Sequence, residues 1–186
     1  MRTAIIIHGT YGKPDENWFP WLKSKLEELD YQVYVPNFPT PTNQSLESWI
    51  DAFIEFNKYI DPQTILVGHS LGVAFILTIL ESMDLPIRAV FLVSGFLGLL
   101  HDNEFDDLNA DFTLRNFNWD KIKNNVQKVY LYHSDNDPHV PIEKANTLAR
   151  NLGIRPTIIN NAGHFNTASG YLRSPQLLSD IKNLDS

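Results

Sequence analysis

The sequence T-I-L-V-G-H-S-L-G-V-A-F-I-L-T-I-L-E-S-M, residues 64–83, contains a short apolar run, a G-x-S-x-G pentapeptide and a longer apolar run. The first run is partly β-branched and predicts a buried parallel strand. The second run, residues 73–80, is apolar on nearly all sides and predicts a buried helix. A strand, a tight turn and a helix around this pentapeptide predict that Ser70 lies at a nucleophile elbow.

The predicted elbow has steric requirements that the neighbouring residues meet. A serine at so sharp a turn adopts a strained backbone conformation that projects its hydroxyl from the sheet edge. Strand and helix approach closely there, and Gly68 and Gly72 supply the small side chains. The helix begins beside Ser70, so the Leu71 amide is a candidate oxyanion donor. The alternative is a glycine-rich turn in which Ser70 only caps the helix.

Composition limits the classes of function that fit the chain. Its 186 residues, 43% of them hydrophobic, predict a single domain over residues 1–186 with a sizeable core. The net charge of −7 argues against nucleic acids and anionic membranes as partners. There is no cysteine, which excludes disulfides and thiolate catalysis. The N-terminal apolar run is too short for a signal peptide or a membrane span, so a cytoplasmic location is expected.

Apolar strand patterns alternate with helical patterns along the whole chain. Strands are predicted at residues 3–7, 32–35, 64–67, 88–93, 128–133 and 156–159, and helices at about residues 18–29, 46–60, 70–80, 141–152 and 175–184. Such alternation predicts an α/β fold, with a mostly parallel sheet of about six strands and helices on both faces. Ligands bind beyond the carboxyl ends of strands in such sheets. Five polar residues follow predicted strands and should share that edge: Thr10, Ser70, Ser94, Asp137 and His164.

A serine hydroxyl needs a base that removes its proton and an acid that orients the base. The chain order expected in this kind of fold is serine, acid, histidine. His164 follows the last predicted strand and is the predicted base. The other five histidines are expected elsewhere: His8 as a hydrogen-bonding residue beside the oxyanion loop, His69 pointing away from Ser70, His101 on an exposed lid, and His133 and His139 flanking the acid.

Two aspartates compete for the role of the acid. Asp137 is preferred to Asp135 because Pro138 fixes the turn that follows it. Either carboxylate could instead cap a loop as an Asx turn. His133 and His139 lie close by in sequence, which leaves a metal cluster conceivable, but serine chemistry with a histidine base needs no metal. The prediction is therefore a site without metal or cofactor.

The loop after the first strand should supply the second oxyanion donor. The amide of Thr10 is the first choice and that of Tyr11 the second, while an ordinary glycine turn is the alternative. A later segment, about residues 95–120, lacks a clean period and mixes aromatic with acidic residues. Long irregular segments in compact domains are often lids, so a lid-like function is expected for it.

Several short motifs together resemble the small serine hydrolases related to retinoblastoma-binding protein 9, including the bacterial YdeN-type proteins. They are H-G-T at 8–10, W-F-P-W-L-K at 18–23, N-F-P-T-P at 37–41, G-H-S-L-G at 68–72, L-V-S-G-F at 92–96, S-D-N-D-P-H-V-P at 134–141 and A-G-H-F at 162–165. The resemblance covers nearly the whole chain. It implies a compact α/β-hydrolase fold, a triad of Ser70, Asp137 and His164, and an oxyanion hole from the Leu71 and Thr10 amides.

The function expected from the residues is acyl hydrolysis through an acyl-enzyme on Ser70, with a small carboxylic ester or a related compound as substrate. A second hypothesis is a protein-binding module on a hydrolase scaffold with weak or no turnover. The acidic and aromatic segment 96–119 motivates it, because such segments can carry contacts with a partner protein. No nucleic acid partner is expected.

Overall fold

The computed structural model describes residues 2–185 and contains one six-stranded sheet. The strand order is β2-β1-β3-β4-β5-β6, and all five pairings are parallel. The strands are β1 (Arg2–Ile7), β2 (Tyr31–Tyr34), β3 (Ile65–His69), β4 (Ile87–Val93), β5 (Val126–Ser134) and β6 (Thr157–Ile159). The predicted α/β class with about six parallel strands is confirmed.

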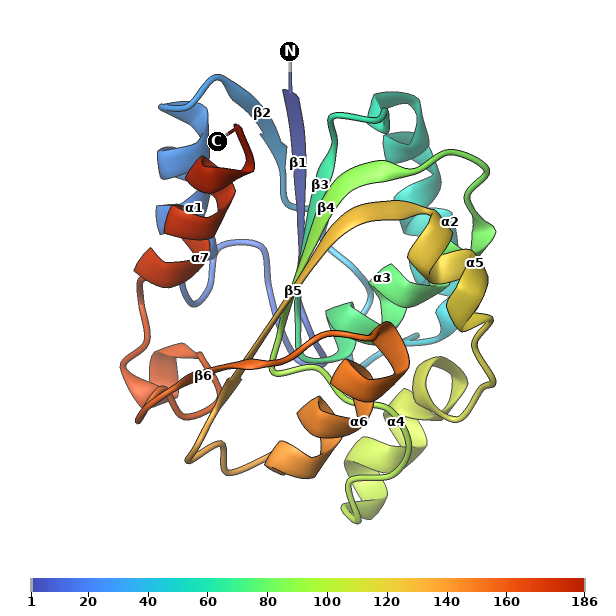
Figure 1. The fold of residues 1–186 in the computed structure, drawn as a ribbon. Coiled ribbons are helices and arrows are strands. Elements are labelled where there is room, and N and C mark those ends of the chain that lie inside the picture. The colour runs from blue at the N-terminus through green and yellow to red at the C-terminus, as the bar shows by residue number, and fades with distance from the viewer. Residues whose placement is uncertain (1, 186) are drawn as a thin grey trace.

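Helices cover both faces of the sheet (Figure 1). They are α1 (Phe19–Glu27), α2 (Leu46–Phe53), α3 (Leu71–Ser82), α4 (Asn103–Thr113), α5 (Trp119–Asn124), α6 (Ile142–Leu152) and α7 (Pro175–Lys182), with 3-10 turns at Ile54–Tyr59, Thr167–Ser169 and Asn183–Asp185. Helices α1 and α7 pack on one face, and α2, α3, α5 and α6 pack on the other. Parallel strands demand this double cover because both faces of the sheet are apolar.

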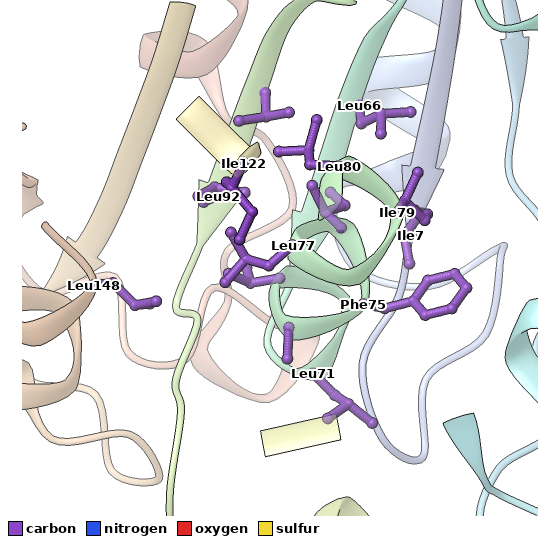
Figure 2. Close-up of a cluster of buried hydrophobic side chains, with 14 of the residues drawn as sticks. Ile7, Leu66, Leu71, Phe75, Leu77, Ile79, Leu80, Leu92, Ile122 and Leu148 are labelled. Atoms are coloured by element: carbon purple, nitrogen blue, oxygen red, sulfur yellow. The ribbon is translucent and has the colours of Figure 1, made fainter. Parts of the chain in front are cut away.

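Helix α3 lies at the centre of the larger core. Its residues from Leu71 to Leu80 are all buried. Figure 2 shows how its side chains face Ile7, Leu66 and Leu92 of the neighbouring strands, with Ile122 of α5 nearby. The helix that follows Ser70 is therefore fixed by packing on all sides, which gives the serine a rigid support.

The segment expected to be irregular contains regular structure. Residues 103–113 form α4, and the side chain of the preceding Asp102 caps the helix by accepting a hydrogen bond from the Phe105 amide. Only three α4 residues are buried, Asn109, Phe112 and Thr113, so the helix has a narrow apolar face. The predicted helix over residues 46–60 also differs, because α2 ends at Phe53 and a 3-10 turn follows.

Within residues 2–185, no helix combines the length and apolar character that crossing a membrane requires.

Candidate active site

Ser70 lies in the tight turn between β3 and α3, with φ 55° and ψ −120°. A non-glycine residue with positive φ is strained, and the surrounding packing must hold it there. The turn is as crowded as the sequence predicts. A Cβ on Gly72 would lie 2.5 Å from the Ile7 carbonyl oxygen, and one on Gly68 would lie 2.7 Å from Ile76 Cδ1. The glycines on both sides of Ser70 are thus sterically required.

His164 and Asp137 are brought together although they lie 27 positions apart. Nδ1 of His164 lies 2.8 Å from Oδ2 of Asp137, whose side chain is 1% exposed. The amides of His139 and Val140 donate to Oδ1 at 2.9 and 3.0 Å. Burial alone would raise the pKa of Asp137, but the hydrogen bonds and the imidazole lower it to about 2. The carboxylate is therefore charged at neutral pH and favours the tautomer of His164 with the proton on Nδ1, in which Nε2 is the nitrogen that can accept a proton.

Asp135, the other candidate acid, has a different role. It is exposed, and its Oδ1 accepts a hydrogen bond from the Asn161 amide at 2.7 Å. This contact joins the loop after β5 to the loop that carries His164. Asp135 thus makes a long-range contact in place of the local Asx turn that was the alternative for it. Asp137 is the aspartate that contacts the histidine, and it also accepts from the amide two positions later in the chain.

Two further residues support the pair of Asp137 and His164. Ser94 follows β4, and its hydroxyl donates to Oδ2 of Asp137 at 2.9 Å. Asn136 accepts a hydrogen bond from the Gly163 amide at 2.8 Å and so ties the two loops together. The sequence predicts that Ser94 lies at this edge of the sheet but does not predict its contact with Asp137. No pattern in the sequence indicates that Asn136 supports the site.

Ser70 and His164 line one cavity of about 230 Å³ and are each 8% exposed. The Ser70 hydroxyl makes no hydrogen bond to another residue in the described part of the chain, 2–185. Hydrogen bonds between catalytic groups are often long in unliganded enzymes and shorten when the substrate binds. The structure thus places the serine and the histidine at one cavity, with the aspartate bonded to the far side of the imidazole.

Among the described residues, the amides of the two predicted oxyanion donors have no hydrogen-bond acceptor, whereas the amide of Tyr11 has one. Leu71 is the first residue of α3, where amides have no partner within the helix. The amide of Thr10 makes no hydrogen bond within residues 2–185, whereas the amide of Tyr11 donates to Thr40 Oγ1 at 2.7 Å. Thr10 and Ser70 line the same cavity. These contacts favour Thr10 over Tyr11 as the second donor.

His8 fixes the loop that carries Thr10. Its Nε2 accepts a hydrogen bond from the Phe38 amide at 3.0 Å, so the proton resides on Nδ1, which donates to the Gly9 carbonyl at 2.8 Å. Burial lowers the pKa of His8, which favours this neutral form. The expected role of His8, a hydrogen-bonding residue beside the loop, matches these contacts.

His69 has a partner that the sequence did not suggest. Its Nε2 donates to the backbone carbonyl of His164 at 2.8 Å, and the two rings lie 4.8 Å apart between centroids. Burial and the neighbouring His164 lower the pKa of His69 to about 3. His69 is therefore a neutral side chain that supports the backbone of His164.

The lowered pKa of His69 predicts a loss of stability in acid. Below about pH 6.5 an unfolded histidine gains a proton that the folded His69 does not bind until about pH 3. The free energy of unfolding should then fall by about 1.4 kcal/mol per pH unit for this group as the pH drops between those values. His69→Gln keeps a donor and removes the titration, so urea midpoints measured from about pH 7 to about pH 5 should depend less on pH.

His101→Gln provides the control for this measurement. His101 is exposed on the surface, so we expect the pH dependence of the wild type to persist in this variant. An unchanged dependence in His69→Gln would contradict the account of the buried ring.

His133 and His139 have different contacts. His133 is buried, and its Nε2 donates to the Val140 carbonyl at 2.9 Å. His139 lines the cavity, with its ring centroid 5.2 Å from that of His164. Within residues 2–185, no group of three or more histidine, aspartate or glutamate residues is arranged to hold a metal ion.

Comparisons with known proteins find a family model and several relatives. A family model described as serine hydrolase matches residues 4–183. YdeN of Bacillus subtilis is 31% identical over 176 residues, which cover 94% of this chain and 91% of YdeN. The serine hydrolase RBBP9 of Rattus norvegicus is 27% identical over 165 residues, with 87% and 86% of the two chains covered.

Solved structures agree on the fold. The crystal structure of the B. subtilis ydeN gene product has a TM-score of 0.91 and 28% identity, covering 99% of this chain and 98% of the other. The structure of Est1E from Butyrivibrio proteoclasticus with ferulic acid bound has a TM-score of 0.70 at 18% identity over 98% of this chain and 90% of its own. The expected α/β-hydrolase fold is confirmed.

Proposed function

The chain belongs to the serine hydrolase family, and from that membership and the geometry of the cavity we propose that it hydrolyses small carboxylic esters through Ser70, His164 and Asp137. The observation that carries the proposal is the buried hydrogen bond between His164 Nδ1 and Asp137 Oδ2 beside the cavity of the strained Ser70. It is the arrangement that a base needs to activate an alcohol.

In the proposed reaction, the Ser70 oxygen attacks the ester carbonyl while Nε2 of His164 takes the hydroxyl proton. The Leu71 and Thr10 amides stabilise the negative oxygen of the tetrahedral intermediate. The intermediate collapses to an acyl-enzyme, and the alcohol leaves with the proton from His164. Water then attacks the acyl group with His164 again as base. The bond between the Ser70 oxygen and the acyl carbon breaks, His164 returns the proton to Ser70, and the carboxylic acid is released. Asp137 stays ionised and stabilises the imidazolium in both steps.

Two assays test the proposal directly. Purified protein should hydrolyse 4-nitrophenyl acetate and should be labelled by a fluorophosphonate, which reacts with activated serines. Absence of both reactions in folded protein would overturn the proposal. Thioesters and activated amides offer the same acyl carbonyl and belong in the same substrate panel.

The size of the cavity predicts a preference for short acyl chains. Its volume of about 230 Å³ lies below the ~300–1,000 Å³ of common ligand pockets, and Phe96, Leu100 and Phe105 form part of its wall. We expect kcat/KM for 4-nitrophenyl acetate to exceed that for the decanoate by at least ~10-fold. Leu100→Ala should widen the cavity and reduce this ratio.

The neighbouring Leu99→Ala is the matched control, because Leu99 is exposed and does not line the cavity. The ratio should stay as in the wild type in this variant. Equal activity on the two esters in the wild type would show that the cavity does not limit acyl length.

The second hypothesis, a protein-binding module with little turnover, was motivated by the segment 96–119. The structure of this segment does not favour it. Phe96, Phe112 and Phe117 are buried in the core and are not available to a partner. Four acidic residues of the segment are exposed, namely Asp102, Glu104, Asp107 and Asp111, so a pull-down with a variant lacking the segment would still test the idea. The cytoplasmic location likewise stays a prediction.

A further inference from the structure

A polar network joins three distant segments at the rim of the cavity. Its members are Thr10, Tyr11, Thr40, Gln44 and Asn109, and we call it the loop-anchor network. Thr10 and Tyr11 follow β1, Thr40 and Gln44 precede α2, and Asn109 lies on α4, which borders the carboxyl-end edge of the sheet in the lower part of Figure 1. No step of the proposed reaction uses the side chains of Gln44 and Asn109.

The hydrogen bonds of the network run in one connected series. The Tyr11 amide donates to Thr40 Oγ1 at 2.7 Å, and the Thr40 hydroxyl donates to Gln44 Oε1 at 2.6 Å. Nε2 of Gln44 donates to Asn109 Oδ1 at 3.0 Å, and the Thr10 hydroxyl donates to the same oxygen at 2.5 Å. Both residues of the oxyanion loop are thus held by the series.

The orientation of Gln44 is fixed by its surroundings. Its Nε2 also donates to the Leu108 carbonyl at 2.8 Å, and a carbonyl oxygen can only accept. The amide oxygen of Gln44 must therefore face the Thr40 hydroxyl and accept its proton. A lone pair of the Thr40 oxygen then accepts the hydrogen bond from the Tyr11 amide. Each group in this part of the network therefore has one possible role, either as donor or as acceptor.

Asn109 is an unusual residue for the face of a solvent-facing helix. It is 1% exposed, and its Nδ2 has no hydrogen-bond partner within residues 2–185, so burying it has a cost in stability. The oxygen of the same side chain accepts two hydrogen bonds. A leucine of similar size would avoid the unpaired amide, so the accepting oxygen is the feature that the position provides.

We propose that Asn109 and Gln44 are positioning residues that hold the Thr10 amide toward the oxygen of the tetrahedral intermediate, and so make α4 part of the oxyanion hole. The inference rests on the proposed function, since it assigns Thr10 as an oxyanion donor. Without the network, the loop after β1 retains the His8 contact with Gly9 and the contacts of the Tyr11 side chain with Glu104 and Phe105. It loses the hydrogen bonds of the Thr10 hydroxyl and the Tyr11 amide, which lie next to the Thr10 amide in the chain. A donor displaced by about 1 Å stabilises the transition state poorly and can lower the rate by about 10²-fold.

The test compares Asn109→Leu with Asn125→Leu. Asn125 is also buried, and its Nδ2 donates to the carbonyls of Leu80 and Met83 near the opposite edge of the sheet. Asn109→Leu should lower kcat for 4-nitrophenyl acetate by about 10- to 100-fold with little change in KM, and should slow fluorophosphonate labelling equally. Asn125→Leu should lower the melting temperature and leave kcat unchanged.

Two more variants separate positioning from general loss of structure. Asn109→Asp keeps the accepting oxygen and should recover most of the lost kcat. Thr10→Val keeps the Thr10 amide and removes the hydroxyl, so its effect and that of Asn109→Leu should not add in the double variant. The pH of half-maximal activity should stay constant throughout, because the pair of His164 and Asp137 is untouched.

Hydrogen exchange gives a readout that does not depend on turnover. The peptide covering residues 9–12 should exchange faster in Asn109→Leu than in the wild type, and not in Asn125→Leu. A kcat for Asn109→Leu equal to that of Asn125→Leu, or additive effects with Thr10→Val, would overturn the inference while the proposed function stands. A wild type without Ser70-dependent hydrolysis would overturn the proposed function, and unchanged exchange at residues 9–12 would then overturn the anchoring role as well.

Discussion

Ser70→Ala is expected to lower kcat for 4-nitrophenyl acetate by about 10⁴- to 10⁶-fold and to abolish fluorophosphonate labelling. The alanine lacks the oxygen that forms the acyl-enzyme, and water at the same place has no comparable activation. Because Ser70 makes no side-chain hydrogen bond within residues 2–185, its removal should leave the fold intact. Hydrolysis rates with purified protein and circular dichroism measure the two effects separately.

Ser82→Ala is the matched control for this experiment. Ser82 lies at the other end of α3, where its hydroxyl donates to the Ile79 carbonyl, and it does not line the cavity of Ser70. We expect wild-type kcat and labelling in this variant. Substantial turnover by Ser70→Ala would mean that another group performs the reaction.

Asp137→Asn should lower kcat by about 10⁴-fold. An asparagine amide can donate to Nδ1 of His164, and the ring then adopts the tautomer that carries its proton on Nε2. This tautomer cannot accept the Ser70 proton. The neutral amide also fails to stabilise the imidazolium that forms in the transition state. A kcat measurement over the range from weakly acidic to weakly alkaline pH should show the loss at every pH.

Asp135→Asn tests the choice between the two aspartates. Its side chain is exposed and contacts the Asn161 amide, and an asparagine oxygen can accept the same hydrogen bond. We expect kcat to stay within about 3-fold of the wild type. A large loss in Asp135→Asn together with a small loss in Asp137→Asn would reverse the assignment.

The strand and helix around Ser70 were predictable because each has a strong local pattern. The apolar run before the pentapeptide fits a strand buried on both faces, and the run after it fits a buried helix. The edge of the sheet on which the candidate residues gather followed from parallel pairing alone. The pairing of Asp137 rather than Asp135 with His164 could be preferred from the sequence, since Pro138 marks the turn.

Helix α4 could not be predicted in the same way. Its acidic and aromatic residues show no clear helical period, because only a narrow face is buried and that face includes the polar Asn109. A buried polar residue looks like a surface residue in the sequence. Its partner Gln44 is 65 positions away, so the contact depends on tertiary packing that no local pattern encodes.

The contact of His69 with His164 escaped prediction for a related reason. Position 69 precedes the serine in the chain, and its backbone direction suggested a side chain unrelated to the site. The hydrogen bond forms with a backbone carbonyl 95 positions later, and backbone acceptors leave no trace in residue type. Only the fold shows that the histidine before the serine supports the histidine of the candidate triad.

The most direct test of the account is mass spectrometry of the protein after reaction with a fluorophosphonate, with the modified peptide sequenced. The account predicts one adduct per chain, located on Ser70, which forms in the wild type and is lost in Ser70→Ala. An adduct on another residue, or an unlabelled Ser70 in a protein that still hydrolyses esters, would contradict it.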